Sequence, residues 1–292
     1  MTSATTPEPE ATMERRPAKK LLDAVSTVAP GMKPRAQRAL IRLGYRIVNG
    51  WMNDAQAECM NYGYAALDER AASALPGADG GDERYGYQLY ARVAGAVPLD
   101  GREVLEVGCG RGGGASYVAR HFGVAGLTGL DFSETAIAFA REHHIDPSLR
   151  FVRGDAEELP FADESFDAVL NVESSHCYPS MPRFTAEVFR VLRPGGHLLF
   201  ADLRLTKDID VMRRDLLAPG FEVVEEEPIT PNVVRALELD SPRRIEFVRR
   251  QVPKVLQSYV FNFAASDNSA VYAALRDGEL EYLRFALAKP GG

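Results

Sequence analysis

A glycine-rich loop is the first segment of the chain whose composition indicates that it binds a ligand. It reads Gly108-Cys-Gly-Arg-Gly-Gly-Gly114, and Gly108, Gly110 and Gly113 have the GxGxxG spacing of a dinucleotide-binding loop. Glycines let the backbone turn tightly and let a ligand approach without interference from a Cβ atom. Because the same spacing also occurs in a glycine-rich turn without a ligand, the loop alone does not decide what is bound.

Three carboxylates fall where predicted strands end, and their positions indicate the kind of ligand. Glu106 comes two residues before Gly108, where a carboxylate suits a cationic amino group better than a pyrophosphate. Asp131 can accept hydrogen bonds from both hydroxyls of a ribose, and Asp155 can accept one from an adenine amino group. An amino-acid end, a ribose and an adenine describe S-adenosylmethionine better than NAD. Each aspartate, taken singly, also fits a helix cap.

The elements that must position these groups alternate between strands and helices. Seven short apolar segments are predicted as strands, at residues 103–107, 126–130, 149–153, 166–171, 197–202, 221–225 and 282–288. Helices are predicted at 85–97, 113–122 and 182–192, and Ser133 is the expected N-cap of a further helix. This alternation predicts an α/β, Rossmann-like, doubly wound sheet that is mainly parallel and has seven strands. In such a sheet, ligands lie outside the carboxyl ends of the strands, where the glycines and carboxylates fall.

Composition divides the chain into three parts. Residues 1–20 are rich in Thr, Pro, Glu and Ala and are expected to be a disordered tail. Residues 21–98 have mainly helical periodicity and are expected to form an N-terminal helical cap. Residues 99–292 are expected to form the core, with a helical insert at about 231–279 before the last strand.

At four motifs in order, over about residues 101–205, the chain resembles the class I S-adenosylmethionine-dependent methyltransferases. The motifs are Glu106 to Gly112, the acid at Asp131, Gly154 to Phe161, and Leu192 to Gly196. The resemblance implies that S-adenosylmethionine is the cofactor and S-adenosylhomocysteine the product. It also implies that the cofactor is held by Glu106, Gly108, Cys109, Gly110 and Gly112 at the methionine part, by Asp131 at the ribose, by Phe132, Asp155 and Ala156 at the adenine, and by Asn171 after the fourth strand.

The segment Asn171-Val-Glu-Ser-Ser-His-Cys-Tyr-Pro179 is expected to lie beside the methyl group that is transferred. Methyl transfer to an alcohol requires removal of the alcohol's proton, and a neutral imidazole with a pKa of about 6.5 suits that task. His176 is therefore the candidate general base, and a packing histidine is the alternative. Glu173 is a candidate to orient His176 or to contact the acceptor, and an acid at a helix N-terminus is the alternative. Tyr178 is a candidate to contact the acceptor.

Two aromatic segments are candidates for the acceptor pocket. Met60-Asn-Tyr-Gly-Tyr64, together with the segment from Glu173 to Tyr178, resembles actinobacterial lipid and natural-product O-methyltransferases of the phthiotriolone and fatty-acid types. That resemblance implies that Tyr62 and Tyr64 cap the site and exclude water, although two aromatic residues packing a helix end fit the segment equally well. In the insert, an aromatic-rich stretch can line an apolar pocket through Tyr259 and Phe263, and core packing is the alternative for each of these residues.

These motifs favour an O-methyltransferase that acts on a hydroxyl of an apolar small molecule, such as a polyketide, a lipid or another secondary metabolite of natural-product or antibiotic biosynthesis. A C- or N-methyltransferase and a fatty-acid carboxyl methyltransferase are alternatives on the same scaffold. A non-catalytic module that only binds the cofactor is an alternative of another class. The three carboxylates and His176 disfavour such a module.

Net charge and cysteine use argue against other classes. Lys and Arg number 34 against 41 Asp and Glu, and the resulting net charge of −7 disfavours a nucleic-acid partner or an anionic membrane surface. Three cysteines without CxxC pairing support neither a disulfide framework nor a zinc site, and we expect no metal. Because no apolar leader opens the sequence and no apolar run approaches the roughly 18 residues that span a membrane, the expected location is the cytoplasm. A homodimer is compatible with the sequence.

Overall fold

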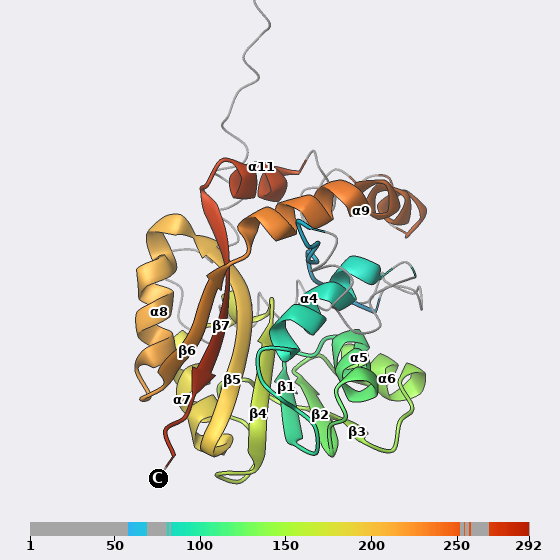
Figure 1. Cartoon of the computed structure of the whole chain (residues 1–292). Coiled ribbons are helices and arrows are strands. Elements are labelled where there is room, and N and C mark those ends of the chain that lie inside the picture. The colour runs from blue at the N-terminus through green and yellow to red at the C-terminus, as the bar shows by residue number, and fades with distance from the viewer. Residues whose placement is uncertain are drawn as a thin grey trace, which may run out of the picture.

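The part of the chain that the structure describes is built on one seven-stranded sheet. This computed structural model describes residues 58–68, 81, 83–251, 254, 257 and 269–291. The strands are β1 (Glu103–Val107), β2 (Gly126–Asp131), β3 (Leu149–Arg153), β4 (Phe166–Val172), β5 (Leu192–Leu205), β6 (Glu222–Pro228) and β7 (Leu280–Ala288). Their order is β3-β2-β1-β4-β5-β7-β6, and β7 runs antiparallel to both of its neighbours (Figure 1). The predicted doubly wound, mainly parallel sheet is confirmed.

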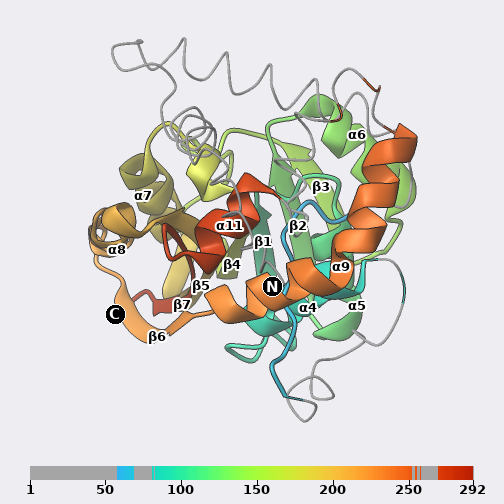
Figure 2. The same ribbon diagram turned by 90° about the horizontal axis from the view of Figure 1, so that it is seen from above.

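Helices cover both faces of this sheet (Figures 1 and 2). One face carries α4 (Arg84–Ala94), α5 (Gly113–His121) and α6 (Glu134–His143), and the other carries α7 (Met181–Val191) and α8 (Ile209–Leu217). A buried apolar cluster lies on each face and holds the layers together. Because both faces of β1 and β4 are covered, these strands are buried along nearly their whole length, which explains their apolar sequences.

Several element boundaries follow the predicted ones, and β5 departs from them. The Ser133 hydroxyl accepts a hydrogen bond from the Ala136 amide, as expected for the N-cap of α6. Strands β1 and β3 begin and end at the predicted residues. Strand β5 is longer than predicted at both ends: it begins at Leu192, which pairs with Phe166 of β4, and it continues to Leu205 because β7 pairs with it from His197 to Leu205. Asp202, the last residue of the predicted strand, lies inside β5. Helix α8 was not predicted from the sequence.

The helical insert lies above the carboxyl ends of the parallel strands (Figure 1). Its described helices are α9 (Thr230–Gln251) and α11 (Ala270–Arg276), which come between β6 and β7 in the chain. Tyr259 and Phe263, which are expected in the acceptor pocket, lie outside the described residues. The expected tail at residues 1–20 and most of the expected helical cap lie outside them as well.

Residues 58–68, which we call the strap, are not helical, and the expected helical cap is wrong for this stretch. The strap passes between α4 and α9 (Figure 2). Gly63 has a φ of 84°, and its N–H donates to Oδ1 of Asn61 at 2.9 Å, which turns the backbone out of a helical path. The strap's backbone groups bond to α4 and α9: the Tyr64 N–H donates to the Tyr85 carbonyl at 2.9 Å, and the Ala65 N–H to the Asn232 carbonyl at 3.1 Å. Tertiary hydrogen bonds thus override helical periodicity here.

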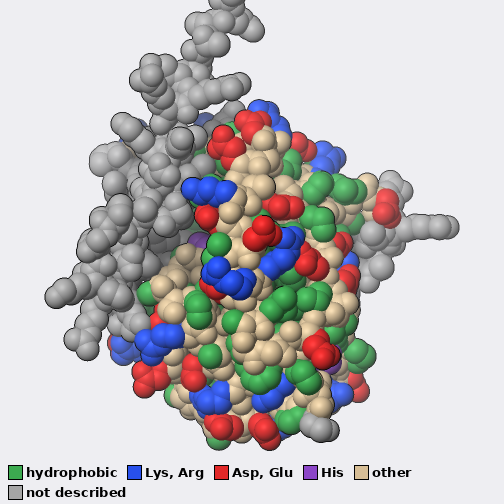
Figure 3. Space-filling model, turned by 90° about the vertical axis from the view of Figure 1, so that its left-hand side faces the viewer, with side chains coloured by type: hydrophobic (Ala, Val, Ile, Leu, Met, Phe, Trp, Pro, Cys, Tyr) green, Lys and Arg blue, Asp and Glu red, His purple; other side chains and the backbone are tan. Residues whose placement is uncertain are grey.

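The face of the molecule that carries α8 mixes acidic and basic side chains (Figure 3). On α8, Arg213 pairs with Asp210 at 2.8 Å and reaches Glu226 of β6 at 2.6 Å. Exposed pairs of this kind contribute little to stability, so they indicate a solvated surface. Among the described helices, none has the length together with the apolar composition that a membrane crossing requires.

Candidate active site

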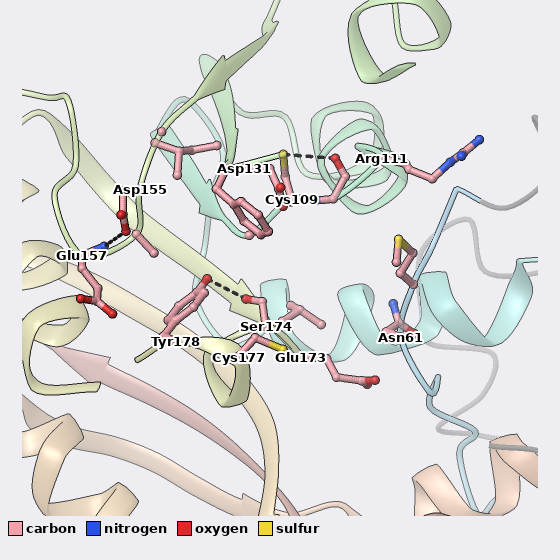
Figure 4. A pocket seen from close by; sticks show the side chains of 18 of the residues that line it. Asn61, Cys109, Arg111, Asp131, Asp155, Glu157, Glu173, Ser174, Cys177 and Tyr178 are labelled. Atoms are coloured by element: carbon pink, nitrogen blue, oxygen red, sulfur yellow. Dashed lines mark hydrogen bonds between the residues drawn. The ribbon is translucent and has the colours of Figure 1, made fainter. Parts of the chain in front are cut away.

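A pocket opens beside the carboxyl ends of β1 and β4, where the strand order reverses (Figure 4). The empty volume of the pocket is about 1010 Å³, which includes the space at its open side. Seven of the residues that the sequence assigned to the cofactor line it: Gly108, Cys109, Gly110, Asp131, Phe132, Asp155 and Ala156. The other three, Glu106, Gly112 and Asn171, are not part of its described wall. The sheet thus gathers most of the predicted residues at one place.

The glycine loop has left-handed backbone conformations that favour glycine. The φ angles are 78° at Gly108, 53° at Gly110 and 86° at Gly112. A Cβ atom on Gly108 would lie 2.4 Å from Oγ of Ser174, so packing requires glycine there. A Cβ atom on Gly110 would project into open space, with Sδ of Met60 at 3.9 Å as its nearest neighbour. Gly110 therefore leaves room for a ligand and is not required by the packing of the protein itself.

Glu106 is buried below the glycine loop at the end of β1. The hydroxyl of Tyr90 on α4 donates a hydrogen bond to Oε1 of Glu106 at 2.6 Å. The other oxygen, Oε2, is buried without a hydrogen-bond partner among the described residues. Burial raises the pKa of the Glu106 carboxyl to about 7. A buried acid with one unpartnered oxygen fits a cationic ligand, because such a ligand supplies the missing donor and stabilises the charge.

Asp131 connects the end of β2 to the glycine loop. Its Oδ2 accepts the Gly110 N–H at 3.0 Å, and its Oδ1 accepts the Ser133 N–H at 2.8 Å. Burial raises the pKa of the Asp131 carboxyl, and these backbone donors oppose the rise. Because each carboxylate oxygen can accept more than one hydrogen bond, Asp131 can also bind a ligand in the pocket that it lines.

Asp155 lies on another side of the pocket (Figure 4). Its Oδ1 accepts the Glu157 N–H at 3.0 Å in the turn after β3. The turn brings Ala156 to the wall, and Phe132 lines the same pocket from the end of β2. A carboxylate next to apolar side chains suits a flat ring that carries a hydrogen-bond donor.

The segment after β4 is tied to the glycine loop by hydrogen bonds. Nδ2 of the fully buried Asn171 donates to the Val107 carbonyl at 2.9 Å and to Oγ of Ser174 at 2.8 Å. The Tyr178 hydroxyl lies 2.9 Å from the same Oγ (Figure 4). Asn171 therefore supports the pocket from behind its wall, and the Tyr178 hydroxyl points toward the loop at Gly108.

His176 lies in the short helix η1 (Ser175–Cys177), next to Cys177 of the pocket wall. Its Nδ1 is 2.8 Å from Oδ1 of Asp202, and its backbone N–H donates to Oδ2 at 2.9 Å. Burial disfavours the charged ring, but Cys177 and the Asp202 carboxylate outweigh burial and raise the pKa of His176 above its usual value. Burial likewise opposes the charge on Asp202, but His176 and Arg204 hold the pKa of that carboxyl below its usual value. The imidazole is thus oriented by a carboxylate and made more basic by its surroundings.

Glu173 does not orient His176 through a described hydrogen bond; its carboxyl faces the strap. Oε2 of Glu173 accepts the Tyr62 N–H at 2.9 Å and the Tyr282 hydroxyl at 3.0 Å. Glu173 has a φ of 49°, a left-handed conformation that is rare for a residue other than glycine. Burial raises the pKa of its carboxyl to about 7.

Comparison with known sequences shows the family to which this chain belongs. Residues 105–200, which span the pocket motifs, match the model of a methyltransferase domain. A fatty-acid O-methyltransferase of Mycolicibacterium smegmatis is 38% identical over 271 residues, which cover 92% of this chain and 97% of that protein. The chain belongs to the S-adenosylmethionine-dependent methyltransferases. This methyltransferase is also 44% identical over 201 residues to a phthiotriol/phenolphthiotriol dimycocerosates methyltransferase of Mycobacterium tuberculosis, which cover 69% of this chain and 74% of that protein.

Solved structures show the same fold at low sequence identity. The [4+2]-cyclase SpnF superposes with a TM-score of 0.65 and 23% identity over 91% of this chain and 100% of that one. A geranyl diphosphate C-methyltransferase of Streptomyces coelicolor has a TM-score of 0.62 and 17% identity over 89% and 100% of the two chains. Because a cyclase and a C-methyltransferase share this fold, the fold of the methyltransferase does not by itself decide which atom is methylated.

The cofactor of the methyltransferase is S-adenosylmethionine. The pocket fits a ligand of this kind on two observations. The buried Oε2 of Glu106 lacks a partner among the described residues, as expected if the ligand brings a cationic donor. Gly110 leaves open the space that a side chain would fill.

The strap contributes to the pocket wall through residues other than its two tyrosines. Glu58, Met60 and Asn61 line the pocket, whereas Tyr62 and Tyr64 are not among its described lining residues. Tyr64 is buried in the apolar cluster on the α4 face. The capping role of the two rings stays a prediction.

Two supporting residues were missed from the sequence. Tyr90 lies in a helix whose residues gave no sign of contact with Glu106, and only the packing of α4 on the sheet brings the two together. Asp202 was predicted only as the last residue of a strand, and its contact with His176 was not expected. Its buried position opposite the end of β4 could have been anticipated, since parallel strands place their carboxyl ends at one edge.

Proposed function

We propose that the methyltransferase transfers a methyl group to a hydroxyl oxygen of an apolar, lipid-type acceptor. The observation that carries this proposal is the 2.8 Å contact between Nδ1 of His176 and Oδ1 of Asp202. A carboxylate that holds one ring nitrogen as a donor leaves Nε2 to take up a proton, which is what a general base requires. The two relatives, whose names refer to a fatty acid and to phthiotriol dimycocerosates, support an acceptor of the lipid type.

For the cofactor, the proposed contacts are those that the sequence predicts, although Glu106 is not part of the described pocket wall. Glu106 and the glycine loop hold the methionine end, Asp131 holds the ribose, and Asp155 with Ala156 holds the adenine, against which Phe132 packs. When bound, S-adenosylmethionine supplies an electrophilic methyl group on a sulfonium. The enzyme's main task is then to hold the acceptor oxygen in line with that group and to exclude water.

The acceptor is proposed to approach from the side of η1 and the strap. Met60, Val172 and Pro179 give the pocket wall apolar surface in this region, next to Cys177. Such a surface favours an alkyl or aryl acceptor over a sugar or a nucleotide.

The raised pKa of His176 favours a second candidate, the carboxylate of a fatty acid. An imidazole whose pKa lies above its usual value keeps its proton to a higher pH than a free histidine does. A protonated imidazole can bind and orient an anionic carboxylate, which needs no general base because it is already ionised. The name of the Mycolicibacterium smegmatis relative supports this candidate. Under either candidate the methylated atom is an oxygen.

Matched acceptors distinguish the two candidates. The full chain is incubated with methyl-labelled S-adenosylmethionine and with pairs of fatty alcohols and fatty acids of equal chain length, and the products are identified by mass spectrometry. Transfer to the alcohol supports the hydroxyl proposal, transfer to the acid supports the second candidate, and transfer to carbon or nitrogen of a wider panel would contradict both. Asp131→Ala is the control, because loss of a charge-assisted hydrogen bond of about 1.5–3 kcal/mol should weaken cofactor binding and lower every product alike.

A further inference from the structure

The strap lines the cofactor pocket through Glu58, Met60 and Asn61 and is anchored to three other parts of the molecule. On the α4 side, the Tyr64 N–H donates to the Tyr85 carbonyl at 2.9 Å. On the α9 side, Nη2 of Arg244 donates to the carbonyls of Asn61 and Tyr62 at 3.1 and 3.3 Å. The third anchor is Glu173, in the segment after β4, whose Oε2 accepts a hydrogen bond from the Tyr62 N–H.

The Glu173 anchor lies next to the strap residues that face the cofactor. Met60 and Asn61 line the pocket immediately before Tyr62, and Glu173 lines it from the segment after β4. Figure 4 shows Glu173 and Asn61 on the same side of the pocket, below the glycine loop. A bond at Tyr62 therefore fixes the position of the two preceding side chains relative to the pocket.

The left-handed backbone conformation at Glu173 indicates that its carboxylate has a specific role. A left-handed conformation is unfavourable for a residue with a Cβ atom, and glycine would adopt it without strain. Glu164 has the same conformation, with a φ of 55°, but its side chain is exposed in a turn between β3 and β4. At Glu173 the side chain is buried and its Oε2 receives two donors. Strain at a residue with buried polar contacts points to a functional role for the side chain.

We propose that Glu173 is a positioning residue that fastens the strap at the cofactor pocket through the Tyr62 amide. The inference depends on the bound cofactor and not on which acceptor atom is methylated. A carboxylate accepts hydrogen bonds more strongly than a neutral acid, so the fastening is tightest when Glu173 is ionised. Burial raises the pKa of this carboxyl to about 7, whereas the Tyr62 amide, His176 and Tyr282 favour its ionised form and Asp202 opposes it.

Hydrogen exchange of single amides tests the proposal without any acceptor. In the full chain bound to S-adenosylhomocysteine, Glu173→Gly should accelerate exchange of the Tyr62 amide tenfold or more. Exchange at Tyr64 and Ala65, whose amides bond to α4 and α9, should change much less. The dissociation constant of S-adenosylhomocysteine should rise roughly tenfold, because Met60 and Asn61 lose their fixed positions.

Glu164→Gly is the matched control, since it relieves the same backbone strain at an exposed site away from the pocket. It should leave both the exchange at Tyr62 and the binding of S-adenosylhomocysteine unchanged.

Glu173→Gln keeps the side-chain length and an acceptor oxygen, so it should give intermediate values and keeps the test valid if the glycine variant does not fold. Tyr282→Phe removes the second donor without touching the strap and should preserve protection at Tyr62. Wild-type exchange and affinity in folded Glu173→Gly, or equal behaviour of the two glycine variants, would overturn the proposal.

Discussion

Tyr90 donates a 2.6 Å hydrogen bond to Oε1 of Glu106. The other carboxyl oxygen, Oε2, is buried and has no hydrogen-bond partner among the described residues. A phenol hydroxyl is a neutral donor, so it orients the carboxyl without supplying a compensating positive charge. Burial consequently dominates, and the pKa of Glu106 rises to about 7. The carboxyl is oriented before the cofactor arrives but becomes fully charged only when a cation joins it.

Cofactor binding should therefore depend on pH through Glu106. Below pH 7 the carboxyl of the free protein is mostly protonated, and a cationic ligand must displace that proton. The dissociation constant of S-adenosylhomocysteine should fall as the pH rises to about 7, by up to tenfold per unit, and then become constant. Titration calorimetry in buffers of different ionisation enthalpy should detect the released proton. Glu106→Gln should bind more weakly and without this slope, whereas an unchanged slope in the variant would exclude Glu106 as its origin.

The stability of the ligand-free protein should show the opposite trend. The folded pKa of Glu106 is raised from 4.5 to about 7, so the stability contributed by its neutral form is fully present below pH 4.5 and is lost as the pH rises through 7. Above pH 7 the loss is about 3 kcal/mol. Ligand-free Glu106→Gln should thus be more stable than the wild type at pH 8, with the difference shrinking toward pH 4. Urea unfolding at both pH values checks this, and a variant that is less stable at pH 8 would contradict it.

Substitutions in the glycine loop should separate binding from folding. Gly110→Ala places a methyl group in open pocket space, so the protein should fold with a loss of about 1 kcal/mol from backbone strain but should lose cofactor affinity. Gly101 has a φ of 66° and, like Gly110, has open space where a Cβ atom would lie, but it is outside the described pocket wall. Gly101→Ala should therefore lose similar stability and keep full affinity. Gly108→Ala should be the least stable, because its Cβ atom would lie 2.4 Å from Oγ of Ser174. Thermal unfolding and calorimetry measure the two effects, and normal binding by Gly110→Ala would contradict the assignment of the loop.

The sheet and the pocket could be predicted because the local sequence determines them. Apolar runs of five to seven residues that end in glycine or an acid mark parallel strands, as at Val107 and Asp131, and parallel strands bring such ends together. The N-cap at Ser133 likewise depends only on residues within one turn of the helix.

The supports of the pocket could not be predicted, because they join segments that are far apart in the sequence. Glu173 and Tyr62 are 111 residues apart, and the pattern around Tyr62 is helical although its backbone bonds to other elements. Glu106 and Tyr90 are 16 residues apart, but their contact depends on how α4 packs on the sheet. Each of these contacts satisfies a buried polar group, a requirement that is evident only once burial is known.

The contact between His176 and Asp202 leads to a last prediction, in which the direction of the pH dependence identifies the acceptor. Burial opposes protonation, but Cys177 and the Asp202 carboxylate raise the pKa of His176 above its usual value, so a general base becomes available only as the pH rises through this raised pKa. With an alcohol acceptor, kcat should increase through that pH range, and His176→Ala should lower kcat by roughly 10²–10⁴ and abolish the dependence. Asp202→Asn removes the negative partner of His176, so the rise of kcat should occur at lower pH. With a carboxylate acceptor the rate should instead fall as the pH rises, because the protonated imidazole binds the anion and loss of that proton weakens acceptor binding. Rates measured from about pH 6 to 10 at saturating cofactor distinguish these outcomes, and an identical profile in His176→Ala would show that positioning alone, without proton transfer to this histidine, accounts for the rate.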